Sequence, residues 1–252
     1  MSPITLAPGT WSPDVHQQLL TLLEQSGDDR RVAVFDLDDT LIAGDIGLAM
    51  LRTHDQRMGT SWISRYEELL AAEGRAAAYP AAALWFEGWT PTELNALCTE
   101  VAHQALETGV IQPRPEMRNL IACLHASGWE VWVCSASLEP AVVVMAQTLG
   151  ISADRVLGMA LEVGSDGRYV GRLAGPPTYE AGKAETIRSR IGEHILLSAG
   201  DSRNDREMLS LARHAIFIEH GDPHETAYAR SRGWWIQSDW PSSPAEHTPT
   251  PS

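Results

Sequence analysis

Three carboxylates stand within four positions of this sequence, at Asp36, Asp38 and Asp39. The residues before them, 32–35, are apolar without helical spacing, which predicts a strand buried on both faces of a parallel sheet. Carboxylates gathered at one strand end repel each other unless a proton or a cation compensates them. Ligands of open α/β sheets bind beyond the carboxyl ends of the strands. The stretch therefore favours a metal-assisted catalytic centre, although an acidic turn would show the same pattern.

Two later predicted strands also end in polar groups. Ser135 follows the strand predicted at 129–134, and Asp201 follows the strand predicted at 194–198. The carboxyl ends of parallel strands meet at one edge of a sheet. We therefore expect Ser135 and Asp201 to lie beside Asp36.

These side chains would support phosphoryl transfer. Asp36 and Asp201 supply the oxygen ligands that Mg²⁺ prefers, and the cation would offset the repulsion between Asp36 and a phosphate dianion. Asp36 can then attack phosphorus, while Asp38 protonates the leaving oxygen and later activates water. The Asp38 carbonyl is a further candidate metal ligand.

Other groups would hold the phosphate. Ser135 offers a hydroxyl and Ala136 an adjacent amide, and Lys183 adds a positive charge at a helix start. Asp205, four residues after Asp201, would orient Lys183 or a metal-bound water. Each group alone has a simpler explanation: Ser135 as a turn residue, Lys183 as a solvated helix start, and the segment at Asp201 as a helix N-cap. Their ordered occurrence favours the catalytic interpretation.

The four motifs together resemble those of the haloacid dehalogenase superfamily of phosphohydrolases. In chain order they are Asp36-Leu37-Asp38-Asp39-Thr40, Ser135, Lys183 and Gly200-Asp201-Ser202-Arg203-Asn204-Asp205. The resemblance covers residues 31–237 and implies a Rossmann-like, three-layer α/β fold. It implies Asp36 as the nucleophile, Asp38 as the general acid and base, and Mg²⁺ held by Asp36, the Asp38 carbonyl and Asp201. Three further motif residues would support the site: Thr40, Ser202 and Asp205.

Strands and helices alternate through most of the chain, which predicts a parallel sheet with right-handed crossovers. The predicted divisions are a core at 1–43 and 113–240, an all-helical cap at 44–112, and a disordered tail at 241–252 that is rich in Pro, Ser and Thr. The cap resembles that of the phosphoserine phosphatase-like branch of the family. A β-hairpin is predicted from 155–163 and 169–172.

The cap would select the substrate. Asp45 lies nine positions after Asp36, where phosphoserine phosphatases place an acidic residue for the substrate's amino group; a first-turn aspartate favoured by the helix dipole explains it equally well. The predicted cap also contains six aromatic residues: Trp62, Tyr66, Tyr79, Trp85, Phe86 and Trp89. Either all six belong to the hydrophobic core, or two or three of them line a box for a quaternary ammonium group. In such a box the cation–π attraction contributes roughly 0.5–2 kcal/mol per contact. Three arginines offer a carboxylate site instead: Arg52, Arg57 and Arg65.

We therefore expect Mg²⁺-dependent hydrolysis of a small phosphomonoester through an aspartyl-phosphate. The substrate would carry an amino or quaternary ammonium group, as phosphoserine, phosphocholine and phosphoethanolamine do. Two alternatives share the scaffold: a non-catalytic protein that binds a phosphorylated ligand, and a phosphomutase.

Charge and composition exclude some partners. The 252 residues include 19 basic and 33 acidic side chains, and the net charge of −14 argues against a nucleic acid partner. The three cysteines lack metal-site spacing and are expected to be reduced core residues. No apolar run is long enough for a membrane span, and no signal peptide is evident, so a cytoplasmic protein without a membrane partner is expected. The expected partner is a small phosphorylated metabolite; nothing predicts an oligomeric state.

Overall fold

The computed structural model describes residues 5–24 and 30–240. Six parallel strands form the main sheet, in the spatial order β10-β9-β8-β1-β4-β5. From one edge to the other, these are β10 (Trp235–Ser238), β9 (Ala212–Glu219), β8 (Ile195–Gly200), β1 (Val32–Phe35), β4 (Glu130–Leu138) and β5 (Val156–Met159). The strand before the acidic cluster therefore lies inside the sheet, between β8 and β4. This confirms the predicted parallel α/β fold.

Helices cover both faces of the sheet. The helices around it are α1 (Pro13–Glu24), α6 (Pro115–Ala126), α7 (Glu139–Thr148), α8 (Ala181–Arg190), α9 (Arg206–Leu211) and α10 (Pro223–Ser231). All four β1 side chains are buried, and they alternate between two cores. Ala33 and Phe35 pack in the core that includes α1, α6 and α7, while Val32 and Val34 pack with α8 and α9. The apolar run without helical spacing is thus explained by burial on both faces.

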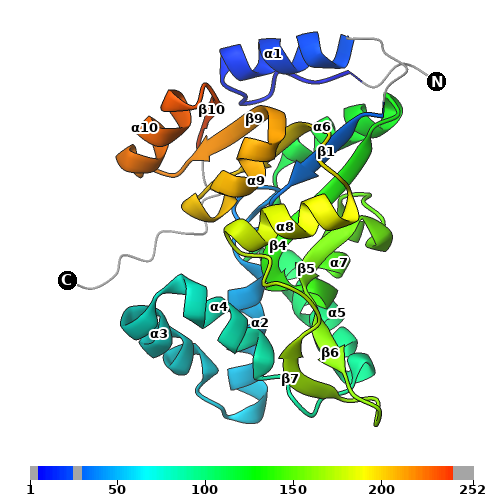
Figure 1. Cartoon of the computed structure of the whole chain (residues 1–252), viewed down its shortest axis with the longest axis vertical. Helices are drawn as coiled ribbons and strands as arrows, with labels where there is room; N and C mark the ends of the chain where they lie inside the picture. Colours follow the sequence, from blue (N-terminus) through cyan, green and yellow to red (C-terminus); the bar gives the residue numbers. More distant parts are fainter. Residues whose placement is uncertain (1–4, 25–29, 241–252) are drawn as a thin grey trace.

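A helical insertion separates β1 from β4. It contains α2 (Ile46–Met58), α3 (Trp62–Glu73), α4 (Arg75–Leu84) and α5 (Pro91–Thr108). The flanking strands β2 (Ile42–Ala43) and β3 (Gln112–Pro113) pair antiparallel, which holds the two ends of the insertion together. Figure 1 shows α2, α3 and α4 at the end of the molecule opposite α1. The division into a separate cap domain at 44–112 stays a prediction.

Local sequence signals explain where the longest helix of the insertion begins and ends. At the start of α5, the Thr90 hydroxyl accepts from the amide of Glu93, and the Glu93 carboxylate accepts from the amide of Thr90, at 3.2 and 2.7 Å. Pro91 occupies the first helical position, where its missing N–H leaves no bond unmade. Gly109 closes the helix at a φ of 75°, a left-handed conformation that favours glycine.

The predicted hairpin at 155–163 and 169–172 is partly wrong. Its first half contains β5, which pairs in parallel with β4. All four β5 residues are buried, and a place in the main sheet provides that burial where a two-stranded hairpin would not. Only β6 (Leu161–Val163) and β7 (Tyr169–Leu173) form a hairpin.

The hairpin contacts the insertion. The amide of Tyr169 donates to the carbonyl of Trp89, and its carbonyl accepts from the amide of Gly88, both at 2.9 Å. Figure 1 shows β6 and β7 at the same end of the molecule as α4. The hairpin therefore supports the helices that lie over the sheet edge.

The next predictions concern the cysteines, membrane spans and the C-terminal tail. The three cysteines, Cys98, Cys123 and Cys134, are buried free thiols, as predicted. Within residues 5–24 and 30–240, every helix is too short or too polar to cross a lipid bilayer. The predicted disordered tail at 241–252 lies outside the described residues.

Candidate active site

Three neighbouring strands bring the predicted catalytic groups together. In the register of the sheet, Phe35 of β1 is paired with Ala199 of β8 on one side and Val133 of β4 on the other. Asp36 follows Phe35 directly, and its amide donates to the carbonyl of Ala199 at 3.0 Å. Asp201 and Ser135 each stand two residues beyond these partners. The predicted convergence at one sheet edge therefore follows from the strand order.

Lys183 lies inside this group rather than in solvent. Its side chain is 2% exposed, and Nζ lies 2.5 Å from Oδ1 of Asp36 and 2.6 Å from Oδ1 of Asp205. Burial alone would lower the pKa of Lys183, but the two carboxylates outweigh it and hold the pKa well above its usual value. The ammonium is therefore charged, and the interpretation as a solvated helix start is wrong.

Asp205 orients Lys183. While Oδ1 of Asp205 accepts from Lys183, Oδ2 accepts from the amides of Asp201 and Ser202, each at 3.2 Å, and from the Ser202 hydroxyl at 3.1 Å. This second set closes a capping box at the short 3₁₀ helix 203–205. A Cβ on Gly200 would lie 2.5 Å from Cβ of Asp205, so only glycine permits this close approach. Of the two predicted roles of Asp205, the structure supports the one toward Lys183.

Three carboxylates of the site are placed to surround a cation. Asp36, Asp201 and Asp205 each offer an oxygen, and these oxygens all lie within 4.8 Å of one another. Burial raises the pKa of Asp36 to about 8, against the opposing charge of Lys183. Burial and the Asp205 carboxylate raise the pKa of Asp201 well above its usual range. Because Asp205 already accepts four hydrogen bonds, Asp36 and Asp201 fit a hard divalent cation best.

Asp38 has a different environment from Asp36. Its Oδ2 accepts from the hydroxyls of Ser137 and Ser135 at 2.8 and 3.1 Å, and its Oδ1 accepts from the amide of Ile46 at 2.8 Å. Burial, with the nearby charge of Asp45, raises the pKa of Asp38 to about 7. A carboxyl with a pKa near neutrality can both donate and accept a proton. Asp38 is thus suited to acid and base work.

Asp39 forms the turn that follows the catalytic strand. Its φ of 53° is left-handed, a conformation that aspartate tolerates better than most residues. Its Oδ1 accepts from the amide of Gly44 at 3.0 Å, and its carbonyl accepts from Nη2 of Arg114 at 3.2 Å, with Nε2 of His220 at the same distance. Thr40, predicted to support the site, is fully buried, and its hydroxyl has no partner among the described residues.

A cavity of about 310 Å³, here called the phosphate pocket, opens over these groups. Seven predicted site residues line it: Asp36, Asp38, Asp45, Ala136, Lys183, Asp201 and Ser202. Its other described lining residues are Asp39, Leu48, Tyr66, Leu70, Arg75, Tyr79, Ser137 and Asn204. Helices α2, α3 and α4 thus complete a pocket that the sheet edge begins. Its volume suits a small ligand.

The six aromatic residues of the insertion divide between pocket and core. Tyr66 and Tyr79 line the phosphate pocket, with ring centroids 6.2 Å apart. The three tryptophans are absent from its described lining. Trp62, for example, stacks on His54 with ring centroids 3.5 Å apart. Two of the six aromatic residues therefore line the pocket, and a box for a quaternary ammonium group stays a prediction.

The predicted arginines of the insertion do not line the phosphate pocket. Arg57 forms an ion pair with Glu100, Arg65 lies 4.5 Å above the ring of Trp85, and Arg52 is exposed. These positions leave none of the three facing the predicted catalytic groups.

Sequence reasoning missed Arg75 and Ser137. Arg75 begins α4 and, with Lys183, supplies the positive charges among the described residues that line the pocket. Ser137 stands two residues after Ser135 on the same strand, where side chains share a face. That spacing could have revealed Ser137, whereas no local signal points to Arg75.

Asp45 caps a helix rather than lying in its first turn, and it also faces the pocket. It is the N-cap of α2, where Oδ1 accepts from the amide of Leu48 at 2.8 Å, and it also lines the phosphate pocket. Burial raises the pKa of this carboxyl. A binding role for its side chain stays a prediction.

The sequence model of the haloacid dehalogenase-like hydrolases matches residues 33–210, from β1 to the helix that follows Asp201. The chain belongs to this family. The match spans all four motifs that the sequence analysis singled out.

Individual relatives agree with this assignment. A histidinol-phosphatase from Neisseria meningitidis serogroup C (strain 8013) is 30% identical over 128 residues, which cover 48% of this chain and 56% of the relative. A probable phosphatase from Mycobacterium tuberculosis (strain ATCC 25618 / H37Rv) is 31% identical over 172 residues, covering 66% and 57%. The chain thus spans little more than half the length of these relatives.

A solved structure shares the fold. A phosphoserine phosphohydrolase-like protein from Francisella tularensis subsp. tularensis SCHU S4 has a TM-score of 0.55 at 15% identity, covering 82% of this chain and 94% of its own. At this identity the likeness shows the fold alone. It agrees with the predicted resemblance to phosphoserine phosphatase-like proteins.

Proposed function

We propose that this chain is a Mg²⁺-dependent phosphatase that hydrolyses a small phosphomonoester through a phosphorylated Asp36. The observation that carries the proposal is the contrast between two aspartates that line one pocket. Asp36 is held by a buried ammonium, whereas Asp38 is held by two hydroxyls and an amide. One environment favours a carboxylate nucleophile, the other a group that exchanges protons. The named phosphatases among the relatives support the same reaction class.

The reaction then proceeds in two displacements. An oxygen of Asp36 attacks phosphorus, the bond from phosphorus to the ester oxygen breaks, and Asp38 gives its proton to the leaving alkoxide. Asp38 then takes a proton from water, whose oxygen attacks phosphorus and breaks the bond to Asp36. Phosphate leaves, and the Asp36 carboxylate is restored. Lys183 holds Asp36 in place and adds positive charge beside the transferred group.

The donor set fits Mg²⁺. Asp36, Asp201 and the Asp38 carbonyl would hold the ion, since hard oxygen ligands and a few retained waters suit it. When bound, it would neutralise charge on the phosphoryl oxygens. A cation would also favour the ionised form of Asp36, opposing the effect of burial on its pKa.

The leaving group is proposed to carry a cationic nitrogen. Asp45 lines the phosphate pocket, where its carboxylate accepts hydrogen bonds from the amides of Leu48 and Gly47. The side chains of Tyr66 and Tyr79 line the same pocket. Histidinol phosphate, phosphoserine, phosphoethanolamine and phosphocholine all place a nitrogen a few bonds from phosphorus, which makes them the first substrates to test.

The test is phosphate release from p-nitrophenyl phosphate with Mg²⁺ present. Wild type is expected to turn over, and Asp36→Asn is expected to lose at least roughly 10³-fold in turnover, as loss of a nucleophile does. Arg118→Gln, an exposed change on α6, is the matched control and should retain activity. Equal inactivity of wild type and Asp36→Asn with metal present would overturn the proposal. An isomeric phosphoester in place of free phosphate would instead indicate a phosphomutase.

A further inference from the structure

A second cavity joins the phosphate pocket beneath the insertion. Its volume is about 40 Å³, and we call it the annex. The two cavities share six lining residues: Asp45, Leu48, Tyr66, Tyr79, Ala136 and Ser137. This shared set makes the annex a continuation of the phosphate pocket rather than an isolated void.

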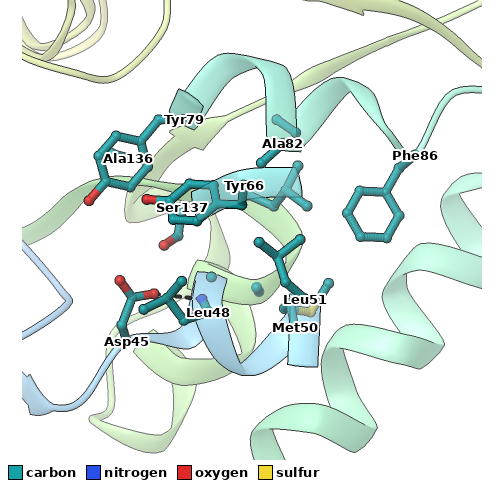
Figure 2. Close-up of a pocket in the computed structure, with 14 residues that line it drawn as sticks. Asp45, Leu48, Met50, Leu51, Tyr66, Tyr79, Ala82, Phe86, Ala136 and Ser137 are labelled. Carbon is teal, nitrogen blue, oxygen red and sulfur yellow. Dashed lines mark hydrogen bonds between the residues drawn. The ribbon is translucent and has the colours of Figure 1, made fainter. Parts of the chain in front are cut away.

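Polar and apolar groups are segregated in the annex. Figure 2 shows the Asp45 carboxylate and the hydroxyls of Tyr66 and Tyr79 on one side, with Phe86 on the far side. The remaining lining, which is not shared with the phosphate pocket, is apolar apart from its backbone: Gly47, Met50, Leu51, Ala82, Ala83, Phe86, Leu138 and Ala141. A ligand group that extends past the lining residues shared with the phosphate pocket, here called the entrance, therefore contacts apolar side chains.

We propose that the annex binds a short apolar part of the leaving group, which makes the substrates phosphate esters of alcohols with a small hydrocarbon branch or chain. The inference rests on the proposed phosphatase function. About 10–15 Å³ accommodates one water-sized group, so the annex has room for two or three carbon-sized groups. Burial of each methylene is favourable, whereas a hydroxyl placed there would lose its hydrogen bonds to water.

The segregation also explains how a cationic group and an apolar group fit one substrate. Asp45 stands at the entrance, and Leu51 and Phe86 line the part of the annex beyond it. A nitrogen at the entrance would meet the carboxylate, and carbons attached further along would enter the annex. Polyol phosphates lack the nitrogen that would meet Asp45. Their hydroxyls would also have to occupy the apolar space of the annex, where they lose their hydrogen bonds to water.

The experiment is a ladder of n-alkyl phosphates, from methyl to hexyl, with kcat/KM measured for each. Once the chain is long enough to reach the annex, kcat/KM should rise about fourfold per added methylene over two or three steps, the factor that burial of one methylene supports. It should then level off or fall when the annex is full. Glycerol phosphate should fall well below propyl phosphate. A flat ladder with an active enzyme overturns this inference and leaves the proposed function standing.

Matched variants locate the effect. Ala82→Leu would fill the annex and should move the optimum to a shorter chain, whereas Ala96→Leu makes the same change on the exposed surface of α5 and should keep the wild-type profile. Leu51→Ala enlarges the annex and should move the optimum to a longer alkyl chain. This variant provides the test of the proposal if Ala82→Leu does not fold. Profiles identical to that of Ala96→Leu in both annex variants would contradict the proposal.

Binding provides a readout independent of turnover. Competition by n-alkyl phosphonates, which resist hydrolysis, should show the same dependence on chain length, and Ala82→Leu should remove the gain of the longer chains. Inactivity toward every ester, including p-nitrophenyl phosphate, overturns the proposed function. Affinity for the phosphonates that does not change with chain length overturns the annex proposal.

Discussion

The two ends of the candidate site are built on different principles. At the sheet edge, Asp36, Lys183 and Asp205 form a buried charged cluster in which each side chain has a hydrogen-bonded partner. Under the insertion, the annex continues this cavity, and beyond the entrance that it shares with the phosphate pocket its lining side chains are apolar. The first end is rigid and chemically specific, because moving one member leaves another buried charge unpaired. The second end can vary in shape without disturbing the first.

This difference separates chemistry from selectivity. Substitutions at the sheet edge should reduce kcat for every ester, whereas substitutions under the insertion should change the ranking of esters. The following predictions test that separation, beginning with the largest expected effect.

Lys183→Met should cause the largest loss. It leaves Asp36 and Asp205 without their shared cation, and breaking a buried pair on one side costs about 3–5 kcal/mol. We expect a lower free energy of unfolding in urea and loss of turnover with all esters. Lys183→Arg keeps the positive charge and therefore tests whether charge alone maintains the stability and turnover of the protein. If Lys183→Met unfolds at the same urea concentration as wild type, the buried ion pairs of Lys183 do not stabilise the fold as proposed.

Asp38→Asn should lower kcat by roughly 10²–10⁴-fold, the usual contribution of a positioned acid or base. The amide cannot exchange the proton, but it retains the backbone carbonyl proposed as a metal ligand. Affinity for Mn²⁺, measured by calorimetry, should therefore change much less than kcat. Ser137→Ala removes one hydroxyl from Asp38 and should have a smaller effect on kcat. An unchanged rate in Asp38→Asn would exclude the proposed role.

Asp45→Asn should change selectivity rather than chemistry. Asparagine is as good an N-cap as aspartate, so α2 should retain its first turn. The kcat/KM for phosphocholine should fall about tenfold, within the range of a lost hydrogen bond or contact to a charged group. The kcat/KM for 3,3-dimethylbutyl phosphate, its uncharged isostere, should change much less, and this smaller change reports the loss of the Asp45 charge beside Asp38. An equal fall for both esters would place Asp45 among the chemical groups.

Glu130→Gln should have the smallest effect, and only on stability. The side-chain bonds from Arg30, together with Arg155, lower the pKa of Glu130 from 4.5 to about 2. The folded state therefore gains stability above about pH 4.5, and this gain is lost as the pH falls toward 2. Thermal melts of wild type and variant should differ most near neutrality and converge near pH 2. If the two melting temperatures do not converge at low pH, the ion pairs of Glu130 with Arg30 and Arg155 do not contribute to stability.

Much of the sheet edge could be predicted from sequence. The run before Asp36, and the polar groups after it, are local patterns whose meaning depends only on the strand they terminate. The order of four motifs along the chain then indicated one family and favoured phosphomonoester hydrolysis over the two alternatives. The hairpin prediction failed because β5 and β6 are adjacent in sequence, and only burial in the main sheet separates them.

The remaining features depend on tertiary structure. The burial of Lys183 requires the strand order that places Asp36 between Asp201 and Ser135, and no pattern within its own helix could reveal that burial. The division of the aromatic residues, with Tyr66 and Tyr79 in the pocket and the tryptophans outside its described lining, depends on how the insertion docks over the sheet. Motif chemistry is local and survives in the sequence, whereas the shape of the cavity arises from contacts between distant segments.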